Sequence, residues 1–183
     1  MFSGKTTELI RRLGEVPSFR SRALKHVTDT RFQTSAIVSH AGRAVPAIEV
    51  ASAGEILRHV HTRTEFVGID EGHFFDVRLS DVVRRLTDRR IDVVIAALQP
   101  DSWGRPFPLV SQLAELADQA LVKHATCARC GASADRTQRL TPIVNGQMVV
   151  DPSNYEPRCQ TCWRPPPDST PESLTAAHEN ARR

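Results

Sequence analysis

The first ten residues constrain the fold of this chain most strongly, because they contain most of a phosphate-binding loop. The full pattern is G-x-x-x-x-G-K-[S/T], and the chain supplies x-x-x-G-K-T over residues 1–6. Gly4 lets backbone N–H groups approach phosphate oxygens, Lys5 reaches the terminal phosphates, and the Thr6 hydroxyl is suited to bind Mg²⁺. A helix that begins near Thr6 adds the attraction of its N-terminal dipole for a bound anion.

Three matching residues at the start of a helix can also arise by chance, so this loop needs support from elsewhere in the chain. The first glycine of the pattern, and the buried strand that leads into such a loop, would lie upstream of Met1. We therefore expect the protein to begin upstream of Met1. The alternative is a truncated protein that lacks a central strand and binds ATP poorly.

Length and composition bound the remaining possibilities. A chain of 183 residues with 40% hydrophobic content is long enough for one main domain and a small appendage. The net charge of +3 is too small to indicate nucleic-acid binding, and no basic tract is interleaved with aromatic residues. No apolar run is long enough to span a membrane and no apolar signal segment opens the chain, so we expect a cytoplasmic protein without membrane contact.

Strand-like and helix-like segments alternate after the loop. This alternation predicts an α/β fold, in which helices cover both faces of a mostly parallel sheet. The expected helices are 6–14, 52–62 (with a Ser52–Glu55 capping box), 76–89 and 109–120, and the expected strands are 21–28, 36–40, 45–50, 66–69 and 93–98.

Two acids follow the apolar strand Phe66–Ile69, where a buried parallel strand delivers polar groups to the carboxyl edge of a sheet. Asp70 is the expected partner of Mg²⁺ in a P-loop enzyme, and Glu71 is placed to accept a proton from an attacking hydroxyl. The alternative is an acidic pair that ends a strand in solvent.

The roles of Asp29 and Arg31 are ambiguous, because such a doublet is usually a surface ion pair.

Four cysteines form two C-x-x-C pairs, Cys127 with Cys130 and Cys159 with Cys162. Two such pairs are typical of a closed, tetrahedral structural zinc site, although unligated buried cysteines are the alternative. Between the pairs, the Asn145-Gly146 dipeptide predicts a hairpin turn. After Trp163 the sequence has no apolar face to bury, so we expect a disordered tail.

The order of these motifs resembles the zinc-containing, RecA-like type of thymidine kinase. The resemblance rests on SGKTTELIRRL, DTR, SHAG, IDEGHFF, CARC with TQRL, and NYEPRCQTC, and covers Met1 to about Trp163. It implies a P-loop RecA-like sheet with a small zinc-anchored lasso that closes over the nucleoside. It also implies transfer of the γ-phosphoryl group of ATP to the 5′-hydroxyl of thymidine or deoxyuridine, with Mg²⁺ and structural zinc, in a homotetramer.

The resemblance assigns roles to particular residues. Glu71 corresponds to the general base, and Thr6 and Asp70 to the magnesium site. ATP-binding positions are Ser3, Gly4, Lys5, Thr6, Thr7, Asp70, Glu71, Gly72 and His73. Nucleoside-binding positions are Met1, Asp29, Arg31, Phe74, Leu98, Ser102, Thr137, Val149, Val150 and Tyr155. The implied divisions are a nucleotide-binding domain over 1–123, the lasso domain over 124–163 and the tail over 164–183.

The chain departs from the family pattern at two further places. Ser102 replaces an aromatic residue that stacks on the base, and only the adjacent Trp103 is near enough in sequence to compensate. In the lasso, Pro152 stands where the family often has glycine, and it removes one backbone N–H.

Two other classes of protein remain as alternatives. A RecA-like ATPase module would hydrolyse ATP without phosphorylating a nucleoside, and the lasso between the cysteine pairs argues against it. A zinc-ribbon nucleic-acid binder needs a basic stripe around the cysteines, and Lys123, Arg129, Arg136 and Arg139 are too few to form one.

Overall fold

The structure, a computed structural model, describes residues 2–30, 35–141 and 152–166. Its elements follow in the order α1 (Lys5–Leu13), β1 (Ser21–His26), β2 (Ala36–Val38), β3 (Ala44–Pro46), β4 (Ile48–Val50), α2 (Ala53–Ile56), η1 (Leu57–His59), β5 (Phe66–Asp70), η2 (Gly72–Phe74), α3 (Leu79–Asp88), β6 (Asp92–Ile95), α4 (Pro108–Leu116), β7 (Ala125–Thr126), β8 (Ser133–Ala134), β9 (Arg136–Arg139), η3 (Pro152–Asn154) and β10 (Tyr155–Arg158), where η denotes a 3₁₀ turn.

The chain divides into two compact units. The larger unit comprises Gly4–Leu98 and Phe107–Val122, and the smaller unit comprises Met1–Ser3, Gln99–Pro106 and Lys123–Arg183. The segment Gln99–Pro106 thus groups with the cysteine-containing part of the chain, although it lies between two elements of the larger unit in sequence.

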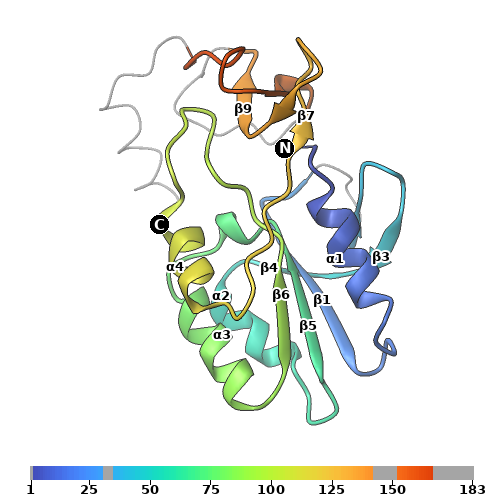
Figure 1. Cartoon of the computed structure of the whole chain (residues 1–183). Coiled ribbons are helices and arrows are strands. Elements are labelled where there is room, and N and C mark those ends of the chain that lie inside the picture. Colours follow the sequence, from blue (N-terminus) through green and yellow to red (C-terminus); the bar gives the residue numbers. More distant parts are fainter. Residues whose placement is uncertain (1, 31–34, 142–151, 167–183) are drawn as a thin grey trace. The chain divides into compact units, whose positions relative to one another are not determined.

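A four-stranded parallel sheet in the order β4-β1-β5-β6 forms the centre of the larger unit (Figure 1). β5 is buried along its whole length, as its continuous apolar sequence predicts for a strand covered on both faces. The register places Lys25 of β1 beside Asp70, the last residue of β5. These observations confirm the predicted α/β fold with a parallel sheet.

Helices cover both faces of this sheet (Figure 1). On one face, α1 buries Leu9, Ile10 and Leu13 in a core that includes Phe66. A Cβ atom on Gly68 would lie 3.0 Å from the Leu13 side chain, so the glycine is what lets α1 approach the sheet so closely. On the other face, α2, α3 and α4 pack around a second and larger apolar core.

The expected strand at 45–50 is wrong in one respect, because the structure splits it into β3 and β4. β3 pairs antiparallel with β2, whereas β4 pairs parallel with β1 in the central sheet. Pro46 has no N–H to donate, and the next amide, that of Ala47, bonds to the Ser35 carbonyl at 2.9 Å. The pairing with the β2 side thus continues to Ala47, and the run changes partners between Ala47 and Ile48.

The helices are shorter than the apolar periodicity predicts, except for α1, which ends at Leu13 with Gly14 as its C-cap. The expected helix at 52–62 is a single α-turn followed by η1. The predicted capping box is wrong: the Glu55 carboxylate accepts the N–H of Ala51, at 3.0 Å, and the Ser52 side chain makes no capping hydrogen bond. In the described part of the chain, no helix is long and apolar enough to cross a membrane.

Short antiparallel pairs build the smaller unit. β7 pairs with β8, and β9 pairs with β10 in a register that places Tyr155 opposite Arg139. The hairpin predicted around Asn145-Gly146 and most of the predicted tail fall in 142–151 and 167–183, which lie outside the described residues.

Candidate active site and metal centre

Gly4 shapes the start of the phosphate-binding loop in the larger unit. Its φ of 75° is left-handed, a conformation that glycine adopts without steric cost, and α1 begins at the next residue, Lys5. Thr6 and Thr7 follow in the first turn of the helix. The positive end of the α1 dipole therefore lies at the predicted loop, where it favours a phosphate group.

Thr6 and Asp70 meet across the unit. The Thr6 hydroxyl lies 3.2 Å and 3.3 Å from the two carboxylate oxygens of Asp70, whose side chain is buried at the end of β5. The contact joins the helix after the loop to the strand that carries the acids. Two oxygen ligands in this position suit a hard cation such as Mg²⁺.

Glu71 has a backbone conformation that is rare for its residue type. Its φ is 52° and ψ is 42°, a left-handed conformation that costs on the order of 1–3 kcal/mol and is enriched at functional sites. A carboxylate oxygen of Glu71 lies 3.5 Å from His73 Nδ1, and the same ring nitrogen accepts the Leu98 N–H at 3.3 Å. In the neutral ring, Nδ1 is thus the acceptor, and the Glu71 carboxylate lies beside it.

Gly72, between Glu71 and His73, fixes the backbone of this turn. Its N–H donates to the Ala96 carbonyl at 2.9 Å, and a Cβ atom at this position would lie only 2.5 Å from Ile95 Cγ2. The glycine therefore lets the turn after Glu71 pack directly on β6.

Aromatic rings surround the acidic end of β5. Phe74 lies 4.2 Å from the His73 ring, and Phe107 lies 5.0 Å from it, measured between ring centroids. His26 at the end of β1 contacts Phe75 edge to face at 4.9 Å. Burial lowers the pKa of His26, although the carbonyl of Ala51 opposes this shift.

Sequence reasoning missed Lys25. Its side chain is 1% exposed, and its ammonium group pairs with the Glu49 carboxylate at 3.2 Å and approaches the Asp29 carbonyl at 3.4 Å. Asp29 itself is buried, which argues against the surface ion pair considered as an alternative, whereas Arg31 lies outside the described residues. The only sequence signal for Lys25 was a single cation inside an otherwise strand-like run.

All four cysteines gather in the smaller unit and none forms a disulfide. Their sulfur atoms lie within 4.8 Å of one another, and the Sγ atoms of Cys130 and Cys159 are 3.6 Å apart. A tetrahedral Zn²⁺ with Zn–S bonds of about 2.3 Å requires sulfur atoms about 3.8 Å apart. The four thiols therefore fit a zinc ion, as the paired C-x-x-C spacing predicts.

Cys127 and Cys162 differ in acidity. Burial opposes ionisation of Cys127, but hydrogen bonds from the backbone N–H groups of Cys159, Arg129 and Cys130 lower its pKa to about 6. Contacts with the thiols of Cys130 and Cys159 raise the pKa of Cys162 to about 12.

Two of the predicted nucleoside-binding positions in the smaller unit are buried. Ser102 is 6% exposed, and Thr137 on β9 is 3% exposed. Burial raises the pKa of Tyr155, and the nearby charge of Arg139, whose guanidinium lies 5.7 Å from the phenol ring, partly opposes this shift. Predicted positions Met1, Val149 and Val150 lie outside the described residues.

Two further residues of this unit were missed by the sequence. Arg139 is 3% exposed, and its Nε donates to the Thr141 carbonyl at 2.8 Å, which fixes a buried cation next to Tyr155. Trp163 directly follows the last cysteine and contacts the loop that carries Ser102. The sequence signalled Trp163 only by its position beside a metal ligand.

These features are typical of P-loop phosphotransferases. They are a glycine loop before a helix, a Thr–Asp pair, and a glutamate at the carboxyl edge of a parallel sheet. The sequence model of the thymidine kinase family matches residues 1–163. A thymidine kinase of Rhodothermus sp. (strain ITI 518) is 40% identical over 96% of this chain and 83% of its own length. A thymidine kinase of Bdellovibrio bacteriovorus (strain ATCC 15356) is 38% identical over 92% of this chain and 84% of its own length.

The chain belongs to the thymidine kinase family. This membership confirms the sequence-based identification of the chain as a nucleoside kinase, a transferase that uses ATP.

Proposed function

We propose that this chain transfers the γ-phosphoryl group of ATP to the 5′-hydroxyl of thymidine, and also of deoxyuridine. The observation that carries the proposal is the contact of Thr6 with Asp70, which brings the phosphate loop to the strand end that bears Glu71. Family membership supplies the nucleoside as the acceptor. The products are ADP and the nucleoside 5′-monophosphate.

Each group at this edge of the sheet has a role in the proposed reaction. The Glu71 carboxylate accepts the proton of the 5′-hydroxyl as its oxygen bonds to the γ-phosphorus. The bond between the γ-phosphorus and the bridging oxygen breaks, and that oxygen leaves with ADP. Lys5 and the backbone N–H groups after Gly4 bind the phosphates. Thr6 and Asp70 would hold Mg²⁺, which supplies neutralisation of the phosphate charge.

In this proposal the smaller unit contributes some of the residues that bind the nucleoside, and the larger unit contributes the others. The zinc has a structural role, because four cysteine ligands leave no open coordination position. Residues proposed to bind the nucleoside are Met1, Asp29, Arg31, Phe74, Leu98, Ser102, Thr137, Val149, Val150 and Tyr155. We further propose that the enzyme is a cytoplasmic homotetramer, since a reducing compartment keeps the thiols available for zinc.

A substrate panel tests the proposal. The purified chain is incubated with ATP and Mg²⁺ together with thymidine, deoxyuridine, deoxycytidine or no nucleoside, and both ADP and nucleoside monophosphate are measured. We expect ADP to form in equal amount with thymidine 5′-monophosphate, less product from deoxyuridine, and almost none from deoxycytidine. ADP release that is independent of any nucleoside would support the ATPase alternative and contradict the proposal.

A further inference from the structure

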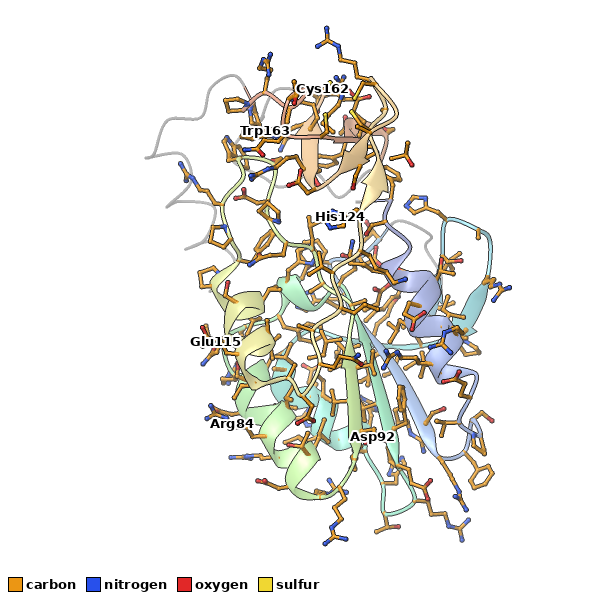
Figure 2. All side chains as sticks on the ribbon, viewed as in Figure 1. Arg84, Asp92, Glu115, His124, Cys162 and Trp163 are labelled. Carbon is orange, nitrogen blue, oxygen red and sulfur yellow. The ribbon has the colours of Figure 1, made fainter. Side chains whose placement is uncertain are left out.

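Trp163 makes a contact that lies outside both the phosphate site and the metal shell. Its Nε1 donates a hydrogen bond to the backbone carbonyl of Ser102 at 3.3 Å, across 61 positions of sequence. Trp163 follows Cys162 directly, and both residues are labelled in Figure 2. The indole therefore joins the second cysteine pair to the loop Gln99–Pro106.

Gly104 of the same loop packs against this indole. Its φ is +79°, and a Cβ atom there would lie 3.3 Å from Trp163 Cη2 and 3.1 Å from Arg136 Nη1. The Arg136 guanidinium lies 5.6 Å from the centroid of the Trp163 ring, within the range of a cation–π contact. Gly104 therefore packs closely against the indole, and its positive φ is strained for any residue with a Cβ atom.

The loop is internally fixed, so a contact at two of its residues sets the position of all of it. The Asp101 carboxylate accepts the N–H of Trp103 at 2.9 Å and that of Arg105 at 2.8 Å. The Asp101 N–H donates to the Arg105 carbonyl at 2.9 Å, which closes the turn. These three bonds hold residues 101–105 in one compact turn.

On its other side, Trp163 is connected to the turn that carries Cys159 and Cys162. The N–H groups of Cys162 and Trp163 both donate to the Cys159 carbonyl, at 3.1 Å and 2.9 Å. The turn that presents two of the four thiols therefore also fixes the backbone of Trp163. A zinc ion bound by this turn would therefore also order the backbone that carries the indole.

We propose that Trp163 is a positioning residue through which the zinc centre holds the Ser102 loop in place for nucleoside binding. This inference rests on the proposed function, in which Ser102 belongs to the nucleoside pocket. Trp163 touches neither substrate nor metal in this account. It acts through the carbonyl of Ser102 and through the packing of Gly104.

Trp163→Phe tests this contact, because phenylalanine keeps an aromatic ring but has neither the indole N–H nor the Cζ2 and Cη2 atoms that lie nearest Gly104. We expect the KM for thymidine to rise about two- to tenfold, the effect of losing one hydrogen bond, while the KM for ATP and the zinc content stay unchanged. Gln160→Ala is the matched control, because this exposed residue lies in the same turn, and it should change none of these quantities.

Fluorescence provides a second readout that needs no catalysis. The chain contains two tryptophans, so Trp103→Phe leaves Trp163 as the only indole. Removal of zinc by a chelator should shift the Trp163 emission to longer wavelength as the ring leaves Ser102 and Gly104, and added zinc should reverse the shift.

The two proposals fail in different ways. A Trp163→Phe enzyme that folds, binds zinc and has an unchanged KM for thymidine overturns the positioning role. An emission wavelength of Trp163 that does not change when zinc is removed overturns it as well. If Trp163→Phe does not fold, the emission measurement alone decides. An unaltered chain that phosphorylates no nucleoside contradicts the proposed function instead, and the emission measurement still tests the link between zinc and the loop.

Discussion

Substitution of Gly72 by alanine is expected to impair both stability and turnover. The new Cβ atom would lie 2.5 Å from Ile95 Cγ2, whereas carbon atoms approach favourably only to about 3.5 Å. The turn after β5 must therefore move by roughly 1 Å, the difference between these two distances. Since the Gly72 N–H is bonded to the Ala96 carbonyl at 2.9 Å, the movement also strains that hydrogen bond.

Overpacking of this kind lowers the free energy of unfolding by about 1–3 kcal/mol. Because Glu71 is the preceding residue, a shift of the turn displaces the proposed base, and a misplacement of about 1 Å lowers kcat by roughly 10²-fold. Denaturant unfolding measures the first effect, and steady-state phosphorylation of thymidine measures the second.

The double variant Gly72→Ala, Ile95→Ala isolates the cause, because it removes the atom that the new methyl group meets. We expect the free energy of unfolding of the double variant to be higher than the value obtained by adding the effects of the two single substitutions. The double variant should also recover part of the lost kcat. Strictly additive effects, or a Gly72→Ala enzyme with normal stability and kcat, would refute the steric argument.

Two other predictions concern pH and zinc. His26 accepts the Thr28 N–H at Nδ1 at 3.2 Å, and burial lowers its pKa from 6.5, so the folded chain binds fewer protons than the unfolded chain just below that pH. The free energy of unfolding should therefore fall as the pH drops below about 6.5, and His26→Gln should reduce this dependence; equal pH profiles would contradict the assignment. Cys127→Ser should lower the zinc content from about one per chain to near zero and destabilise the smaller unit, as measured by metal analysis and thermal unfolding, whereas a zinc-free chain of full stability would argue against a structural metal.

The central sheet was predictable because its signals are local and redundant. Phe66–Asp70 is apolar until its last residue, and the structure buries all five positions. The C-x-x-C pairs were equally informative, because four thiols at that spacing have few other uses. Gly4 and Gly14 mark the start and end of α1, as loop and C-cap glycines do.

The elements that were misjudged depend on contacts distant in sequence. The run at 45–50 is uniformly strand-like, and only the different pairing partners before and after Ala47 divide it. Burial of Lys25 depends on Glu49 from a neighbouring strand, which periodicity cannot reveal. The contact of Trp163 with Ser102 spans 61 positions, so no local pattern could indicate it.

The assignment of Glu71 as the general base is the central claim, and comparison of Glu71→Gln with Glu65→Gln tests it most directly. Both changes remove one carboxylate, but Glu65 is exposed and precedes the opposite end of β5. We expect Glu71→Gln to lower kcat by about 10²- to 10⁴-fold while ATP binding stays nearly intact, and Glu65→Gln to behave like the unaltered enzyme. Near-normal turnover of thymidine by Glu71→Gln would contradict the account.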